Sequence, residues 1–507
     1  MITRPTAAII LGLALLLGIL GDFLLRPEGP TGLTLLLWAA TLVVAVLVLE
    51  RRVGGILSRE ARVWYGVGIA FTATMVWRAS PALVLLAFLA AVTAFALPVY
   101  RAGAAWVRGT GLLHYVGALF WAPLRVALNG ALTLLDAEWG SLRSGGERSS
   151  WRRAAAVARG VAIAAPLLLV FGALFFAADA VFANLVTEGL RVDFELVASH
   201  LLLMGFFGWL GAGYLRSLLT GTEVPTPRGL LPYRPRLGIT EVGVALGLVD
   251  LLFLLFVLIQ LRYLFGGAPL VEVTPGLGYA EYARRGFFEL LAVSVLALPL
   301  LLSASWILER KEARDERIFR AAAGVQVLLV LAVMASAVQR LRLYQDAYGL
   351  TSSRFYAAVA LGWLALIFLW FVATVLRGGE RHFAFGALLF ALLTAAILIV
   401  VNPDAIVVRG NAARAAAGEE FDAGYALSLS TDALPALVAA LDRLPEVERC
   451  RIARGLIERV TENRRTGWQA WNWSELRADA AIEDAMPRLR PAAVAPRVRA
   501  PCQEIER

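Results

Sequence analysis

Long apolar stretches separated by short polar segments recur along the whole chain. Predominantly apolar runs of about eighteen residues or more match the length that an α-helix needs to cross a bilayer. The pattern therefore predicts an all-α, polytopic helical membrane protein with about eleven transmembrane helices. The predicted spans are residues 6–25, 31–50, 63–79, 82–99, 160–182, 197–217, 239–262, 286–307, 321–339, 355–376 and 384–401.

One further apolar stretch, residues 111–135, is interrupted by His114, Pro123, Arg125 and Asn129. Both of its flanks are basic, and basic flanks favour the same side of a membrane. We therefore expect a helix that lies at the membrane surface or re-enters the membrane. If this stretch crosses instead, the number of spans becomes twelve.

The apolar runs end near residue 402, and the composition of the chain changes there. The tail is predicted to form soluble helices, and Asp432 would cap one of them with Pro435 in its first turn. The chain thus divides into a four-span membrane segment (1–99), a basic cytoplasmic or interfacial segment (100–159), a seven-span membrane core (160–402) and a small helical extramembrane region (403–507).

The composition agrees with this architecture. Hydrophobic residues make up 59% of the chain and charged residues 17%, whereas a soluble domain is typically about 45–50% apolar and about 25% charged. The lipid bilayer is therefore the first expected partner. The net charge of +9 would suggest nucleic acid in a soluble protein, but here the arginines lie between apolar runs and act as topology signals. No nucleic-acid partner is expected.

The arginines also predict an orientation. The N-terminus and the loops after even-numbered spans carry more than twice as many Lys and Arg residues as the loops after odd-numbered spans. Because basic loops stay in the cytoplasm, the N-terminus is predicted to be cytoplasmic and the C-terminal region external. Cys450 and Cys502 would then lie in an oxidising compartment, where a disulfide between them can form.

Charged residues gather at the mouth of one predicted span. In a helix, Glu281, Arg285 and Glu289 fall at i, i+4 and i+8, which places acid, base and acid on one face. Glu289 would lie about a turn below the membrane surface, where an unpaired carboxylate is costly and marks a functional candidate. The alternative is a structural ion-pair ladder that joins two helices.

Asp250 is the deepest carboxylate in the predicted spans, near the middle of residues 239–262. Such groups mark ion pathways and proton relays, so Asp250 and Glu289 are candidates for ion or proton coupling. The alternative for Asp250 is a protonated side chain, or one that is hydrogen-bonded to a neighbouring helix.

Two further polar stretches lie on the predicted external side. Two tyrosines and Arg354 between the spans 321–339 and 355–376 suggest a recognition surface, although an ordinary capped helix–turn–helix explains the same residues. The second stretch follows the last span. The candidate functional cluster is Glu281, Arg284, Arg285, Glu289, Tyr344, Tyr348, Arg354, Asp404 and Asn411.

Several kinds of chemistry leave no signature in the sequence. It contains no phosphate-binding Walker-A loop, dinucleotide fingerprint, G-x-S-x-G or H-E-x-x-H motif. ATP-driven transport by this chain alone is therefore not expected, and an enzyme is the less favoured class. The three histidines are isolated and C-x-x-C is absent, so neither a metal nor a cofactor is predicted.

Three stretches, residues 279–290, 343–354 and 402–435, together resemble a family. Their order and character are similar to the bacterial multi-pass membrane family with the domain of unknown function numbered 4173, which is close to 4153. The resemblance covers roughly residues 160–440. It implies a helical membrane fold in the bacterial cytoplasmic (inner) membrane, and it carries over no catalytic residue.

These patterns support three functional hypotheses. The first is a protein that senses, scaffolds or regulates at the external face, where the three polar stretches form one site for a protein partner or a small ligand. The alternative is a proton- or ion-coupled transporter that uses Asp250 and Glu289. The third is a membrane-embedded enzyme that acts on an envelope or lipid substrate.

Overall fold

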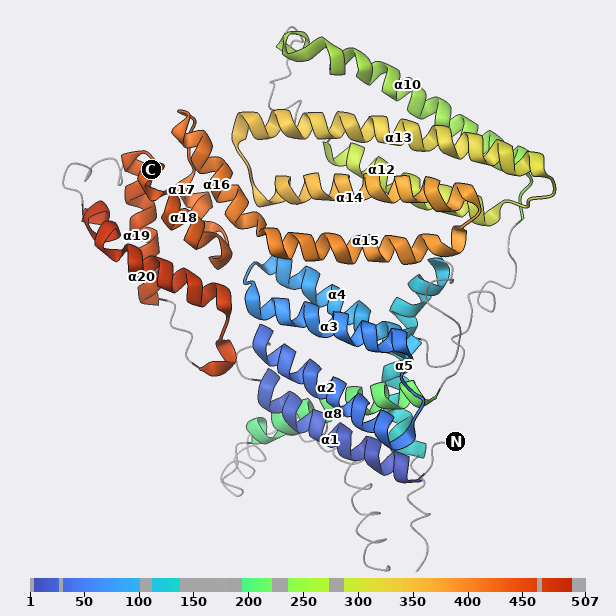
Figure 1. Cartoon of the computed structure of the whole chain (residues 1–507), viewed down its shortest axis with the longest axis vertical. Coiled ribbons are helices and arrows are strands. Elements are labelled where there is room, and N and C mark those ends of the chain that lie inside the picture. Colours follow the sequence, from blue (N-terminus) through green and yellow to red (C-terminus); the bar gives the residue numbers. More distant parts are fainter. Residues whose placement is uncertain are drawn as a thin grey trace, which may run out of the picture.

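The computed structural model describes residues 4–26, 31–100, 112–136, 194–220, 236–272, 287–462 and 467–494, together with the single positions 171, 175 and 178. The described chain is all-α, as predicted, with one isolated β-bridge between Leu237 and Leu308. Long helices lie side by side and form a membrane bundle (Figure 1). A smaller group of helices, the C-terminal domain (residues 403–494), packs against one end of the bundle, and the N-terminus lies at the other end (Figure 1).

Among the described residues, nine helices are long and apolar enough to cross a membrane. Each of them overlaps a predicted span. The predicted span 160–182 lies outside the described residues except at three single positions, so its structure stays a prediction. The nine helices are α1 (Arg4–Leu25), α2 (Gly32–Val53), α4 (Pro81–Tyr100), α8 (Phe194–Leu219), α10 (Ile239–Glu272), α12 (Phe287–Ile307), α13 (Ala313–Tyr348), α14 (Ser352–Thr374) and α15 (Glu380–Val401).

Helix α3 (Arg59–Trp77) completes the bundle, although its first turn is too charged for it to be counted among the nine. It packs between α2 and α4. Its buried Met75 belongs to the same core cluster as Leu83 of α4 and Ile399 of α15. This cluster joins the helices before residue 220 to those after residue 236, and it brings the ends of α3 and α15 to the same end of the bundle.

Helix α5 (Leu112–Asp136) corresponds to the interrupted stretch 111–135 and does not run with the others. Figure 1 shows it set across the end of the bundle that is remote from the C-terminal domain. Its Arg125 donates to the carbonyl of Ser217 (3.2 Å) near the end of α8. Gly213 permits this approach, because a Cβ there would lie 1.9 Å from the carbonyl oxygen of Val126. Its placement at the membrane surface or as a re-entrant helix stays a prediction.

The C-terminal domain has a core of its own, built from residues such as Leu437, Ile452, Leu456 and Ile482. The helices predicted for this region are present among its described residues. Cys450 is buried in α19, and Cys502 lies outside the described residues, so their disulfide stays a prediction. The helices are α16 (Pro403–Ala416), α17 (Ala423–Ser428), α18 (Leu434–Ala440), α19 (Glu446–Glu462) and α20 (Trp473–Val494), with single turns η4 (Thr431–Ala433), η5 (Leu441–Arg443) and η6 (Trp468–Ala470).

Candidate functional site at the junction of the two parts

The C-terminal domain begins directly where α15 ends, at Asn402. Asn402 has φ 58° and is the one described non-glycine residue with a positive φ. An asparagine tolerates this left-handed conformation better than most residues, and it ends α15 and begins α16 within a single residue. Its side-chain oxygen accepts from the N–H of Ala405 (3.3 Å), and Pro403 follows in the first turn, where no N–H is needed. The sequence thus sets the turn that brings the two parts together.

Arg78, in the turn between α3 and α4, binds the end of α15. Its Nε donates to the carbonyl of Ile399 (2.7 Å) and its Nη2 to the carbonyl of Val400 (3.0 Å). The last carbonyls of a helix lack partners within the helix and carry partial negative charge, so a buried guanidinium stabilises them. The Arg78 guanidinium also lies 4.3 Å from the ring centre of Trp77.

Asp432 reaches the same turn from the other side. Its fully buried side chain accepts from the backbone N–H groups of Ala79 (3.1 Å) and Ser80 (2.8 Å) through Oδ2. Its Oδ1 lies 3.9 Å from Nη1 of Arg78. The prediction that Asp432 caps its own helix is therefore wrong: it caps the start of α4, 352 positions earlier in the chain, because that helix start offers free N–H groups beside a buried cation.

A second buried carboxylate, Asp404, fastens the domain to α14. It accepts from the Ser352 hydroxyl (3.0 Å) at the start of α14 and from the Ser430 hydroxyl of the domain. Tyr425 accepts from the N–H of Ser352 (2.7 Å) through its hydroxyl oxygen. Together with Asn402, whose amide donates to the Asp432 carbonyl (2.9 Å), these residues form the junction site: Arg78, Ser80, Ser352, Asn402, Asp404, Tyr425, Ser430 and Asp432.

Four other residues of the predicted cluster meet beside the junction site. The Arg354 guanidinium lies 3.9 Å from the ring centre of Tyr344 and 5.9 Å from that of Tyr348. The Asn411 amide pairs with both the N–H and the carbonyl of Leu350, each at 2.8 Å. The structure thus gathers these residues around the α13–α14 turn, where they mainly bind one another. This agrees with the capped-turn alternative, and their role in recognition stays a prediction.

The remaining predicted residues lie elsewhere. Glu281, Arg284 and Arg285 fall outside the described residues. Glu289, in the first turn of α12, is exposed. Asp250, in α10, has its Oδ1 buried without a hydrogen bond to any described residue. No hydrogen bond or ion pair within the described ranges joins Asp250 to Glu289, so a shared pathway stays a prediction.

A cleft of about 670 Å³ opens beside the junction site, between the bundle and the C-terminal domain. Its wall on the bundle side contains Trp77, Arg78 and the end of α15. The domain supplies Trp473 and further arginines. The charged residues that line the cleft are Arg78, Arg409, Asp432, Arg443 and Arg477.

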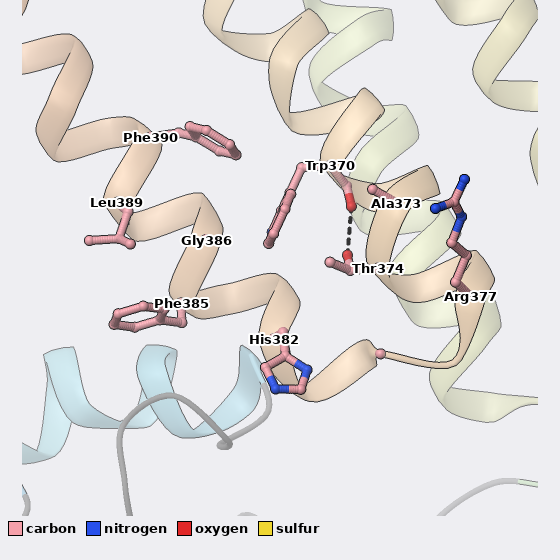
Figure 2. A pocket seen from close by; sticks show the side chains of 10 residues that line it. Trp370, Ala373, Thr374, Arg377, His382, Phe385, Gly386, Leu389 and Phe390 are labelled. Atoms are coloured by element: carbon pink, nitrogen blue, oxygen red, sulfur yellow. Dashed lines mark hydrogen bonds between the residues drawn. The ribbon is translucent and has the colours of Figure 1, made fainter.

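A second hollow, of about 540 Å³, lies between α14 and α15 at the opposite end of the bundle. Figure 2 shows Trp370 standing between the two helices, with His382 near the turn that joins them. Two of its polar side chains already have partners: the Trp370 indole donates to the carbonyl of Phe383 (3.1 Å), and Thr374 donates to that of Trp370 (2.6 Å). Within the described ranges, no three His, Cys, Asp or Glu side chains are placed to hold a metal.

Comparison with known proteins gives one match. The family model for the domain of unknown function DUF4153 matches residues 65–440, which include every residue of the junction site. The predicted family, with the domain of unknown function numbered 4173, is not among the matches. The comparisons with curated proteins and with solved structures gave no match.

Proposed function

Since this chain belongs to the family of the domain of unknown function DUF4153, which is defined without an activity, we propose its function from the junction site. The chain is a membrane-anchored sensor or regulator. Its C-terminal domain docks on the membrane bundle through the Arg78–Asp432 pair, and a signal at the junction changes that docking.

The burial of the Arg78–Asp432 pair carries this proposal. A buried ion pair has a desolvation cost that often cancels its attraction, so such pairs are weak evidence for stability and are better attested in registry and switching. A domain that needed only to be attached could bury apolar side chains instead.

The pair is also suited to two discrete states. Arg78 caps the end of α15, and Asp432 caps the start of α4. Separation of the C-terminal domain from the bundle would therefore expose the last carbonyls of α15 and the N–H groups at the start of α4 at the same time. Because these contacts break as a unit, the junction favours a docked state and an undocked state over a continuum.

The external face is the proposed location of the domain. The excess of Lys and Arg in the loops at the other end of the bundle supports it. Cysteine labelling in intact cells tests it, with Cys450 and Cys502 replaced and single reporters at the exposed residues Ser353, Ser428 and Arg52. We expect external labelling at Ser353 and Ser428 and none at Arg52; the reverse pattern would place the domain in the cytoplasm.

Docking itself is tested by distances between two spin labels. We place one label at the exposed Leu85 of α4 and the other at the exposed Ala480 of α20, in a chain without native cysteines. The wild-type chain should show a main short distance and a minor longer one. The substitution Asp432→Asn should enlarge the longer population, and Asp484→Asn, an exposed control, should not. One identical distribution in all three chains and in every membrane composition would refute the proposal.

A proton- or ion-coupled transporter remains the second candidate, because Asp250, inside a predicted span, has a buried oxygen without a hydrogen bond to any described residue. In proteoliposomes this function requires an ion flux that Asp250→Asn abolishes. An enzyme acting on an envelope or lipid substrate ranks third, since serine hydroxyls and backbone N–H groups already occupy the junction carboxylates.

A further inference from the structure

The cleft beside the junction site has an excess of positive charge. Four arginines and one carboxylate line it, and that carboxylate, Asp432, already binds Arg78 and two backbone N–H groups. Arg443 and Arg477 make no hydrogen bond or ion pair with any described residue, and both are exposed. The charges of Arg477 and Arg78 repel each other. The described lining of the cleft therefore has a net positive charge.

The arginines approach the cleft from several elements. Arg78 comes from the bundle, whereas Arg409 lies on α16, Arg443 on η5 and Arg477 on α20. Arg409 uses its Nε for the Ala405 carbonyl (3.1 Å) of its own helix. Guanidinium groups that converge from different elements suit a tetrahedral oxyanion, because a guanidinium without other partners among the described residues, as on Arg443 and Arg477, can present two parallel N–H donors to it.

The surroundings of the cleft place it at a membrane boundary. Trp77 and Trp473 line it, and Trp473 is 43% exposed. The neighbouring Trp468 is 50% exposed and packs against Phe23 at the end of α1, with ring centres 6.3 Å apart. Trp77 ends α3, and the two domain tryptophans lie near the ends of membrane helices, which is the level at which tryptophans contact lipid headgroups.

We propose that this cleft binds a phosphate-bearing anion, supplied by the headgroup of an anionic phospholipid or by a soluble phosphate compound. The inference rests on the proposed function, because it names the ligand class of the same junction. The anion bridges Arg78 on the bundle to Arg443 and Arg477 on the domain. Its binding relieves the repulsion among the arginines and favours the docked state.

The test uses the full-length protein in nanodiscs of phosphatidylcholine, with or without phosphatidylglycerol, and native mass spectrometry to count retained lipids. The cleft variant is Arg443→Gln with Arg477→Gln, which keeps the fold because both side chains are exposed. The matched control, Arg454→Gln with Arg490→Gln, removes the same charge from exposed positions outside the cleft. A second arm adds inorganic phosphate to protein in phosphatidylcholine alone and measures the melting temperature.

We expect the wild type and the control to retain phosphatidylglycerol about tenfold more tightly than the cleft variant, a difference of about 1.4 kcal/mol. If inorganic phosphate instead raises the melting temperature of the wild type and not of the cleft variant, the ligand is a soluble phosphate compound. Equal lipid retention by all three chains, with no effect of phosphate, overturns the inference. The spin-label distances are measured in the same samples, so a failure of ligand binding is distinguished from a failure of docking.

Discussion

The junction site and helix α10 each hold a carboxylate away from bulk water, and the surroundings of the two carboxylates are opposite. Asp432 accepts from two backbone N–H groups through Oδ2, and its Oδ1, which has no hydrogen bond to any described residue, lies 3.9 Å from Nη1 of Arg78. Asp250 keeps one buried oxygen without a hydrogen bond to any described residue. The cost of removing a charge from water is thus offset at the first position and left uncompensated at the second.

The comparison separates two kinds of polar residue in a membrane protein. A carboxylate that is bound on several sides holds parts of the chain together, and its replacement costs stability. A carboxylate without partners is itself a cost to stability, so it is retained for another reason or carries a proton.

Asp432→Ala should cause the largest loss. It leaves Arg78 buried without its counter-charge and frees the N–H groups of Ala79 and Ser80, and breaking a buried pair in this way typically costs about 3–5 kcal/mol. Chemical unfolding of the purified protein in detergent measures the loss. Asp432→Asn keeps one acceptor oxygen and should lose less. Equal stability of the wild type and Asp432→Ala would show that the junction pair stabilises nothing.

Asp404→Ala should have a smaller effect at the same junction. Unlike Asp432→Ala, it leaves no buried cation without its counter-charge, and the freed Ser352 and Ser430 hydroxyls can rotate toward other acceptors. We therefore expect a total loss of about 1.5–3 kcal/mol, the contribution of one hydrogen bond to a charged group. A double-mutant cycle with Ser430→Ala isolates the contribution of one contact by the same unfolding measurement. Additive effects would mean that the Asp404–Ser430 contact contributes no free energy of its own.

Asp250→Leu should change the free energy of unfolding in the opposite direction. A charged residue near the centre of a span costs about 2.5–3.5 kcal/mol on insertion scales, and here no described partner compensates it. The variant should therefore be at least as stable as the wild type in the detergent unfolding experiment. A loss as large as that of Asp432→Ala would place a binding partner of Asp250 outside the described residues, and the contrast would fail.

These two carboxylates also show which features of the structure can be predicted from the sequence. The hydrophobic pattern predicts the membrane helices, because helix length and apolar composition are local properties. The presence of Asp250 within a span is visible for the same reason. The pairing of Arg78 with Asp432 is not visible in the sequence, because two segments more than 350 positions apart carry no local signal that pairs them.

The predicted functional cluster shows the same difference between contacts near in sequence and contacts distant in sequence. Tyr344, Tyr348 and Arg354 are near in sequence, and the structure brings them together. Asp404 lies near them through its hydrogen bond to Ser352, and its partners, Ser352 and Ser430, were not predicted. On the bundle side of the junction site, the sequence offers an arginine beside a serine and a proline at a helix break, in Arg78-Ala79-Ser80-Pro81.

A third carboxylate, Asp479 on α20, offers the smallest test and extends the comparison to the surface of the C-terminal domain. Partial burial raises the pKa of the Asp479 carboxyl, the nearby Glu483 raises it further, and Arg459 lowers it. The native carboxyl therefore binds its proton more tightly than the unfolded one. The stability that this proton gives is complete below the unfolded pKa of about 3.9 and is lost as the pH rises through the native pKa.

Asp479→Asn mimics the protonated form, so it should be slightly more stable than the wild type at neutral pH and equal to it at low pH. Thermal unfolding of the two proteins across this pH range measures the difference, with Asp484→Asn as the exposed control. Solvent screening keeps the effect small. A variant that is less stable than the wild type at neutral pH would mean that the attraction of Arg459 outweighs burial and Glu483. Asp479 would then belong with the partnered carboxylates of the junction site and not with Asp250.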